Sequence, residues 1–436
     1  RPYRFGHSPG RMQHHIDFSP HPQCPAPFNL ADYVLHHGQA EAGKVALAEV
    51  GNATLTYGQL RHTVLSAAAH LQDQGVQSQD RVMLRLGNTS AFPIIFLALI
   101  AIDALPMPVS PMLTGTERDH LITLTDPARI ITDDTIGGVL QPHPAPVKPI
   151  LGDPNRAGYI MFTSGTGGAP KAVVHAHRAV WARRMMWTDW YDLQADDRLY
   201  HAGAFNWSFT LGTGLLDPWA RGGTAIIAPG IPPSAHILRH HNVTICAAAP
   251  GVFRQLLARE GRIDAPTLRH GLTAGDRLPP TVRDGWQQAT GTPLYEAFGM
   301  TECSTFLSDR PGQPPGLTPQ NGRHVALTND GRLGVHISDP GLMLGYWKGG
   351  QMTLPQRDNV FETNDMMQLT PPHTLQFLAR DGGAVERWGL SYQPGRGRRP
   401  PYNPSLCGRN CRDRGPRQNR HLCYCRLLHC RSRYCD

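Results

Sequence analysis

Helical stretches and short β-rich runs alternate along most of this chain, and this alternation constrains its fold more than any other feature. Apolar residues recur at helical spacing through Leu60, Val64 and Leu71, and a strand-like run follows at 81–86. Such alternation is typical of an α/β protein with a parallel, doubly wound sheet. Further strands are expected at 129–132, 159–163, 225–228, 244–248, 271–274 and 294–298, and helices at 93–101, 251–259 and 280–289.

Shifts in composition divide the 436 residues into segments. A Pro-rich linker at 141–154 interrupts the α/β pattern, and short β-like pieces with glycine turns replace it from Gly331 to Arg380. At about 100–200 residues per domain, this length predicts two to four domains. We predict an N-terminal extension at 1–27, doubly wound α/β subdomains at 28–155 and 156–325, a small β-barrel at 326–381 and an Arg/Pro/Cys-rich tail at 382–436.

The basic charge of the chain is concentrated in its tail. The formal net charge of +8 and the pI near 9.1 would alone indicate an anionic partner such as nucleic acid. Residues 382–436, however, hold twelve Arg, no Lys and three acids, whereas residues 1–381 hold 30 basic and 31 acidic residues. The body of the protein is therefore close to neutral, and we expect no nucleic-acid partner.

Cysteine usage and apolar patterning both predict a cytoplasmic protein. Three dispersed cysteines in residues 1–381 fit a reducing compartment better than a disulfide framework. Residues 1–27 contain no apolar core of a signal peptide. The most apolar stretch, 91–109, is interrupted by Asp103 and three prolines, so we expect a buried helix and strand there and no membrane span.

A string of glycine and hydroxyl residues follows the strand expected at 159–163. It reads Thr163-Ser164-Gly165-Thr166-Gly167-Gly168-Ala169-Pro170-Lys171. Glycines let the backbone turn tightly and aim N–H groups inward, while hydroxyls and a lysine add donors, which is how a loop holds a polyphosphate. The string is not a Walker A loop, because Ala172 rather than Ser or Thr follows Lys171. Composition alone leaves a flexible linker as the alternative.

Carboxylates near two other predicted strand ends give the second and third signals. Tyr295 to Glu302 places an aromatic ring, a glycine, a hydroxyl and a carboxylate at the end of a strand. A ring there can stack on a base, and Glu302 can hold a Mg²⁺ ion that bridges phosphates. Asp365 and Arg380 follow further along. The alternatives are a buried strand that ends in a solvated glutamate, and unrelated surface charges.

Together these segments resemble the adenylate-forming superfamily of acyl-CoA synthetases, adenylation domains of peptide synthetases and luciferase. Residues 163–171 are similar to its Thr-Ser-Gly-Ser/Thr-Thr-Gly-x-Pro-Lys signature, with Gly167 where Thr is usual. Residues 298–302 match Tyr-Gly-x-Thr-Glu, with Phe298 for Tyr. The resemblance covers about residues 28–381. Ala274-Gly275-Asp276 looks like the adenine-contacting element, Gly345-Tyr346-Trp347 like the run before the barrel, Thr363-Asn364-Asp365 like Thr-Gly-Asp, and Phe377 with Arg380 like Phe-x-Gly-Arg.

The resemblance implies an AMP-forming ligase that uses ATP to convert a carboxylic acid to acyl-AMP and then transfers the acyl group to coenzyme A. It assigns catalytic roles to Thr163, Lys171, Thr301 and Glu302, with Glu302 as the Mg²⁺ ligand. Positioning and charge neutralisation supply most of the rate in such phosphate chemistry. The nucleotide-binding residues that it implies are Thr163, Ser164, Gly165, Thr166, Gly167, Gly168, Lys171, Ala274, Gly275, Asp276, Glu296, Ala297, Phe298, Gly299, Met300, Thr301, Asp365 and Arg380.

Two departures from the family pattern affect these roles. Gly167 lacks the usual threonine hydroxyl, which removes one donor to the phosphates. Asn364 stands for glycine, a modest change because Asn tolerates positive φ.

The acyl pocket implied by the resemblance comes from residues 201–214 and from the two glycine-containing strand ends. Phe205 and Trp207 would suit an aromatic or medium-length apolar acid. For His201, an ordinary core or surface histidine is an equal alternative. The predicted pocket residues are His201, Phe205, Asn206, Trp207, Gly275, Gly299 and Met300.

The tail at 382–436 does not continue the family pattern. Relatives carry a mobile C-terminal domain with a catalytic lysine here, whereas this tail has no lysine and six scattered aliphatic residues, too few to fold alone. A one-base shift over 389–399 and 403–412 permits peptides that look like that domain. We therefore hypothesise a frame slip near 381–383 and loss of the thioester step. A zinc site in the Cys/His run at 407–430 is the alternative, although its spacing is irregular.

Three functions follow as candidates from the sequence. The first is an acid–CoA ligase whose partners are a small carboxylic acid, ATP and CoA, with a homodimer left open. The second is an adenylation domain that loads a carrier protein. The third is a nucleotide-binding remnant that holds ATP or acyl-AMP without turnover.

Overall fold

The computed structural model describes residues 12–17, 20–52, 54–164, 169–328, 331–370, 374–380, 385–387 and 390–392. The loop residues Gly165, Thr166, Gly167 and Gly168 lie outside these ranges, as does the predicted tail apart from two short paired strands, β22 (Val385–Arg387) and β23 (Leu390–Tyr392). The predicted zinc site lies outside the described residues, as does the predicted unfolded tail apart from these two strands.

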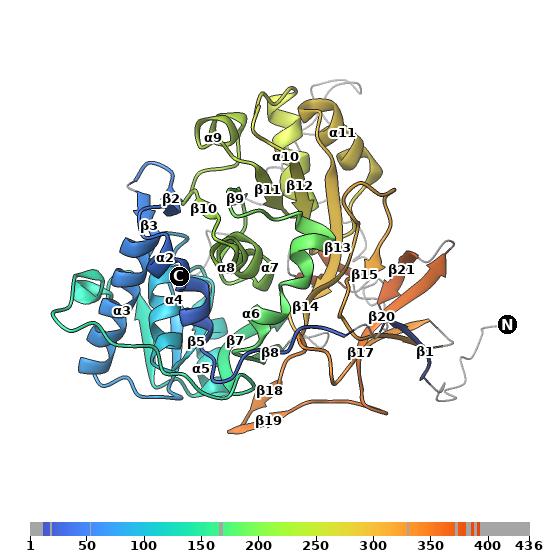
Figure 1. Ribbon diagram of the computed structural model, residues 1–436. Helices are drawn as coiled ribbons and strands as arrows, with labels where there is room; N and C mark the ends of the chain where they lie inside the picture. The colour runs from blue at the N-terminus through green and yellow to red at the C-terminus, as the bar shows by residue number, and fades with distance from the viewer. Residues whose placement is uncertain are drawn as a thin grey trace, which may run out of the picture. The chain divides into compact units, whose positions relative to one another are not determined.

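The largest element is a nine-stranded sheet in the order β15-β14-β13-β12-β11-β9-β10-β2-β3 (Figure 1). Its six central strands are parallel, and antiparallel strands close both edges. Parallel strands are covered on both faces, which accounts for the continuous apolar runs that the sequence showed. The strands are β2 (Val45–Glu49), β3 (Thr54–Thr56), β9 (Arg198–His201), β10 (Thr224–Ile227), β11 (Ile245–Ala248), β12 (His270–Thr273), β13 (Leu294–Met300), β14 (Ser304–Ser308) and β15 (Thr318–Pro319).

Helices cover both faces of this sheet. On one face, α9 (Ala235–His240), α10 (Pro250–Glu260) and α11 (Pro280–Thr290) bury a core that includes Phe253 and Trp286 (Figure 1). On the other, two π-helical turns, η2 (Trp187–Tyr191) and η3 (Gly212–Leu216), lie among short helices. Those helices are α6 (Ala179–Ala182), α7 (Ser208–Leu211) and α8 (Asp217–Arg221).

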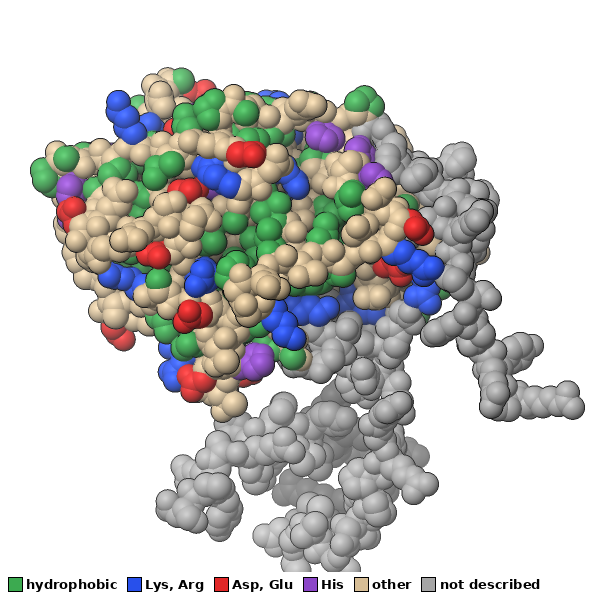
Figure 2. Space-filling view, turned by 90° about the horizontal axis from the view of Figure 1, so that it is seen from below, with side chains coloured by type: hydrophobic (Ala, Val, Ile, Leu, Met, Phe, Trp, Pro, Cys, Tyr) green, Lys and Arg blue, Asp and Glu red, His purple; other side chains and the backbone are tan. Residues whose placement is uncertain are grey.

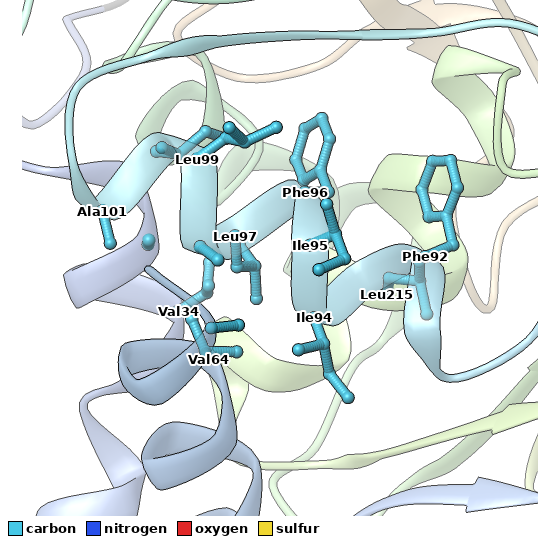
Figure 3. Close-up of a cluster of buried hydrophobic side chains, with 14 of the residues drawn as sticks. Val34, Val64, Phe92, Ile94, Ile95, Phe96, Leu97, Leu99, Ala101 and Leu215 are labelled. Carbon is cyan, nitrogen blue, oxygen red and sulfur yellow. The ribbon is translucent and has the colours of Figure 1, made fainter. Parts of the chain in front are cut away.

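A smaller parallel sheet, β5-β4-β6, forms the N-terminal part. Beside it lies α4, whose apolar residues are buried almost all round and pack on Val34, Val64 and Leu215 (Figure 3). None of the described helices is long and apolar enough to cross a bilayer. The elements are α1 (Leu30–Leu35), α2 (His37–Ala40), α3 (Tyr57–Asp73), β4 (Arg81–Arg85), α4 (Ala91–Ala101), β5 (Leu105–Pro108), α5 (Gly115–Thr125), β6 (Arg129–Thr132) and η1 (Gly137–Leu140).

Two antiparallel sheets complete the fold. One has the order β19-β18-β8-β7, and the other the order β1-β16-β17-β20-β21. The expected short strands between Gly331 and Arg380 are therefore present. The strands are β1 (Met12–Asp17), β7 (Ala157–Ser164), β8 (Pro170–Ala176), β16 (Val325–Thr328), β17 (Arg332–His336), β18 (Gly345–Lys348), β19 (Gln351–Thr353), β20 (Val360–Thr370) and β21 (Thr374–Arg380).

The α/β class and the parallel sheet are confirmed, while the subdomain boundaries stay a prediction. Two pairings cross the predicted boundaries: β2 joins β10 of the large sheet, and β1 joins β16. Figure 2 shows one face of the molecule, on which acidic and basic side chains are interspersed.

Candidate active site

The described ends of the predicted phosphate loop lie on the paired strands β7 and β8. Thr163 at the end of β7 lies opposite Lys171 near the start of β8. Both side chains line a cavity of about 520 Å³, whose walls also include Thr301, Glu302 and Tyr346. The hairpin register therefore brings a hydroxyl and an ammonium group to the same cavity.

Tyr346 joins Lys171 to Glu302. The Nζ atom of Lys171 lies 4.7 Å from the centre of the Tyr346 ring, and the Tyr346 hydroxyl donates a 2.7 Å hydrogen bond to Oε1 of Glu302. Glu302 is only 6% exposed. Burial raises the pKa of its carboxyl, while the Tyr346 hydrogen bond and the Lys171 charge act in the opposite direction. The structure thus brings Lys171 and the acidic strand end together around one cavity.

His175 fixes the backbone beside Glu302. It lies on β8, stacks on Tyr159 with 4.9 Å between ring centres, and its Nε2 lies 2.9 Å from the carbonyl oxygen of Thr301. Burial lowers the pKa of His175 to about 4, so the ring is neutral near pH 7 and donates through Nε2. This histidine was not predicted as a site residue, and its position on the same strand as Lys171 was the available signal.

A second cavity of about 570 Å³ contains the predicted adenosine contacts. Asp276, Phe298, Asp365 and Arg380 line it, and Phe298 stacks on Phe377 at 5.9 Å between ring centres. The strand register of β20 and β21 sets Asp365 opposite Arg380, and Nε of that arginine donates to Oδ1 of Asp365 at 2.9 Å. The cavity offers an aromatic face and, at another wall, a carboxylate held in place by a guanidinium.

Asn364 adopts the conformation that its place in the motif requires. Its φ is +62°, in the left-handed region where glycine or asparagine is favoured. The substitution of Asn for the family's glycine therefore fits the backbone at this position.

Glu296 supports this second cavity from inside its wall. Its Oε1 accepts a 2.8 Å hydrogen bond from the Leu278 N–H, and its Oε2 lies 3.3 Å from Nη2 of Arg283. Burial raises the pKa of Glu296 to about 7. Glu296, Ala297, Gly299 and Gly275 line the cavity, but the Glu296 carboxylate braces the Gly275–Leu278 turn.

A third cavity, of about 140 Å³, matches the predicted acyl pocket in part. Asn206, Trp207, Gly275, Gly299 and Met300 line it as expected. Ala274, predicted as a nucleotide contact, lines this cavity as well. Its other lining residues are Phe162, Thr163, Arg183, Ser208, Phe209, Thr301, Ser304 and Thr305.

The structure places two of the predicted acyl-pocket residues elsewhere. Phe205 is buried in the N-terminal core, with its ring centre 5.1 Å from that of Phe92. His201 is buried behind the cavity, where its Nδ1 accepts the Gly203 N–H at 3.0 Å and its ring meets Phe209 edge-on. Burial lowers the pKa of His201 to about 3, consistent with the alternative of an ordinary core histidine.

The three cavities adjoin through shared walls. Arg380 lines both the 520 Å³ and the 570 Å³ cavities, and Gly275 and Gly299 line both the 570 Å³ and the 140 Å³ cavities. Thr163, Met300 and Thr301 separate the 140 Å³ cavity from the 520 Å³ cavity. A single extended ligand can therefore place an aromatic base, a polyphosphate and a small acid in three connected compartments.

Comparisons with known proteins agree with this geometry. A family model described as AMP-binding enzyme matches residues 35–347. The chain is 25% identical over 408 residues to a 3-hydroxybenzoate–CoA ligase of Aromatoleum sp. (strain CIB), covering 80% of this chain and 76% of that protein. It is 26% identical over 325 residues to a 3-hydroxybenzoate–CoA/4-hydroxybenzoate–CoA ligase of Thauera aromatica, covering 65% of this chain and 62% of that protein.

Among solved structures, the anthranilate CoA ligase AuaEII in complex with anthranoyl-AMP shares the fold. The two structures superpose with a TM-score of 0.74 at 20% sequence identity, over 85% of this chain and 80% of that chain. The predicted fold of the N-terminal part of adenylate-forming enzymes is thereby confirmed.

Proposed function

This chain belongs to the AMP-binding enzyme family, and from that premise we propose that it is an AMP-forming acid–thiol ligase for a small aromatic acid. In the reaction of such a ligase, the first step joins the acid to the α-phosphate of ATP, and the second transfers the acyl group from acyl-AMP to the thiol of CoA. The frame slip hypothesised near 381–383 would remove the second step from this chain. The observation that carries the proposal is that the three cavities share walls. Thr163, Met300 and Thr301 lie between the 520 Å³ and 140 Å³ cavities, Gly275 and Gly299 between the 570 Å³ and 140 Å³ cavities, and Arg380 between the 520 Å³ and 570 Å³ cavities. The names of the two relatives, both hydroxybenzoate ligases, support an aromatic acid.

Each cavity supplies one part of the first step. The adenosine of ATP occupies the 570 Å³ cavity, with its base on Phe298 and its ribose hydroxyls at Asp365. The β- and γ-phosphates lie in the 520 Å³ cavity beside Thr163 and Lys171, and the acid occupies the 140 Å³ cavity. This arrangement sets the carboxylate against the α-phosphate where the cavities join, which lowers the entropic part of the barrier.

The reaction is an in-line displacement at phosphorus. A carboxylate oxygen forms the new O–P bond to the α-phosphate as the bond to the bridging oxygen breaks, and pyrophosphate leaves with the electron pair. Lys171 neutralises the charge that gathers on the departing pyrophosphate. His175 positions the Thr301 carbonyl and therefore the backbone on which Glu302 follows.

Glu302 fits the role of a Mg²⁺ ligand. Magnesium in nucleotide sites is bound by one or two carboxylates together with substrate phosphates. Glu302 presents one buried carboxylate to the cavity that would hold the triphosphate, and the Tyr346 hydroxyl orients it. The ion would supply charge neutralisation between the phosphates when bound.

Acid-dependent exchange of labelled pyrophosphate into ATP tests the proposed first step. We expect exchange with benzoate or a hydroxybenzoate that requires both the acid and Mg²⁺. A second assay measures the release of CoA thioester, with a holo-carrier protein as the comparison acceptor. It identifies which thiol accepts the acyl group. ATP binding by calorimetry without exchange for any acid of an aromatic and aliphatic panel would contradict the proposal and favour a nucleotide-binding remnant.

A further inference from the structure

One member of a buried ion pair, Arg183, lines the 140 Å³ cavity, and its partner Asp217 lies behind it. Nε of Arg183 lies 2.9 Å from Oδ1 of Asp217, and Nη2 lies 2.7 Å from Oδ2. Asp217 is fully buried and Arg183 is 5% exposed. Arg183 lines both this cavity and a narrow extension of about 20 Å³ beyond it. The cationic member of the pair therefore lies at a wall of the predicted acyl pocket.

The backbone around Arg183 is shaped to hold it. The η2 turn supplies Tyr191, whose hydroxyl donates to Oδ2 of Asp217 at 2.9 Å, and the η3 turn supplies Thr213, 3.3 Å from Nη2 of Arg183. A Cβ atom at Gly212 would lie 2.2 Å from Cζ of Arg183, so only glycine leaves room for the guanidinium. π-Helical turns are rare and occur frequently at functional sites. Two of them converge on one arginine here.

Ser304 is the second polar group of this wall, and it too is held in an unusual conformation. Its φ is +61°, and it accepts a hydrogen bond from Nη1 of Arg183. A Cβ atom at Gly299 would lie 2.3 Å from the Ser304 carbonyl oxygen, so the opposing strand bulge depends on glycine. Residues held in sparsely populated backbone regions occur often at ligand-binding sites.

This wall retains donors for a ligand. A guanidinium has five N–H groups. Within the described part of the chain, the contacts of Arg183 use Nε, both hydrogens of Nη2 and one hydrogen of Nη1, which leaves one Nη1 hydrogen without a partner. The hydroxyl hydrogen of Ser304 is likewise unassigned in those contacts. Two donors thus remain on the wall of the cavity that Arg183 and Ser304 form.

The charge of the wall decides which acceptor fits. Because Asp217 already neutralises Arg183, a second carboxylate on the substrate would bring an unpaired negative charge into a buried site, at a large desolvation cost. A neutral acceptor, such as a phenolic hydroxyl, loses only its hydrogen bonds to water and regains them from the wall. The volume of about 140 Å³ is below the range of drug-sized pockets, which excludes long acyl chains.

We infer that Arg183 and Ser304 select small ring acids that carry a neutral hydrogen-bond acceptor, such as a hydroxyl group, over both unsubstituted and dicarboxylic acids. This inference rests on the proposed function and names the substrate class of the same site. Ser304 is the specificity-determining contact, and Arg183 both positions it and donates beside it.

Binding of non-reactive acyl-AMP analogues tests the inference without relying on turnover. The probes are benzoyl, 2-, 3- and 4-hydroxybenzoyl and 3-carboxybenzoyl sulfamoyl adenosines, titrated by calorimetry into the full chain. We expect the best hydroxylated analogue to bind about tenfold more tightly than the benzoyl analogue, the effect of one neutral hydrogen bond. The carboxylated analogue should bind more weakly than the benzoyl analogue.

The variant Ser304→Gly removes the hydroxyl and suits the positive φ at this position. We expect it to reduce the ratio of hydroxybenzoyl to benzoyl affinity to less than twofold. Ser308→Ala is the matched control, because Ser308 is a buried hydroxyl on the same strand that does not line the cavity, and it should keep the preference. If the preference for hydroxylated analogues survives Ser304→Gly, or if the carboxylated analogue binds most tightly, this inference is wrong while the proposed function still stands. No binding of any analogue would contradict the proposed function as well.

Discussion

On the nucleotide side of the site, charged side chains line open cavities. On the acid side, Arg183 and Asp217 are buried and form an ion pair with each other. Lys171 and Glu302 line the 520 Å³ cavity, where a polyphosphate and its cation would meet them directly. Asp217 is fully buried, and both of its oxygens bind Arg183. The difference indicates that the nucleotide side suits charged ligand groups, whereas the acid side suits a small ligand that carries a neutral hydrogen-bond acceptor.

Glu302→Gln should cause the largest loss of activity, and it tests whether the nucleotide side acts through charge. Glutamine keeps an acceptor for the Tyr346 hydroxyl but removes the negative charge that would bind Mg²⁺. We expect kcat for pyrophosphate exchange to fall by about 10²–10³-fold, the range for loss of one electrostatic contact to the transition state. Glu362→Gln, on the wall of the same cavity, is the control and should retain most of the activity. A fall of less than tenfold for Glu302→Gln would contradict the role.

Arg183→Met probes the stability of the acid side. Removing one partner of a buried pair leaves an uncompensated charge, so we expect the free energy of unfolding in urea to fall by about 3–5 kcal/mol. Arg239→Met is the control, because the Arg239–Asp264 pair is 62% and 67% exposed and should cost less than about 1 kcal/mol. The double variant Arg183→Met/Asp217→Leu should recover part of the loss. Equal losses for Arg183→Met and Arg239→Met would show that the pair is not locked within the fold.

Glu296 should give the smallest effect of the three residues tested. It is a carboxylate on the nucleotide side of the site, but it is buried in the wall of the 570 Å³ cavity. Burial raises its pKa from 4.5 to about 7 in the folded chain. Between those values the folded chain holds a proton that the unfolded chain has released, so the free energy of unfolding decreases as pH rises from about 4.5 to about 7. Above pH 7 the contribution stays constant.

The variant Glu296→Gln removes this titration. Relative to the unmodified chain, its free energy of unfolding should rise by about 1–3 kcal/mol between pH 5 and pH 7.5. Urea unfolding at the two pH values measures this difference. Parallel pH profiles for the two proteins would contradict the raised pKa.

Local patterns were sufficient to predict the fold class and the placement of the nucleotide motifs. Parallel strands buried on both faces leave continuous apolar runs, and residues at strand ends and hairpin turns meet because the topology brings them together. Lys171 and Glu302 follow this rule, since each lies beside a strand end. Their functional roles stay predictions.

The acid side was less predictable, because its contacts join residues that are distant in sequence and carry no local signature. Arg183 and Asp217 are 34 positions apart and are held together by residues of two π-helical turns. The hydrophobic periodicity of the sequence does not predict such turns. Phe205 shows the same limit. An aromatic residue in a loop suits a pocket or a core equally well. In the structure, Phe205 packs against Phe92 and is part of the core.

The most direct test of the central claim is a crystal structure of this chain with Mg²⁺ and a non-hydrolysable ATP analogue. The account predicts a triphosphate in the cavity between Lys171 and Glu302, with the adenine on Phe298. A triphosphate bound elsewhere, or one that Lys171 and Glu302 do not both approach, would contradict it.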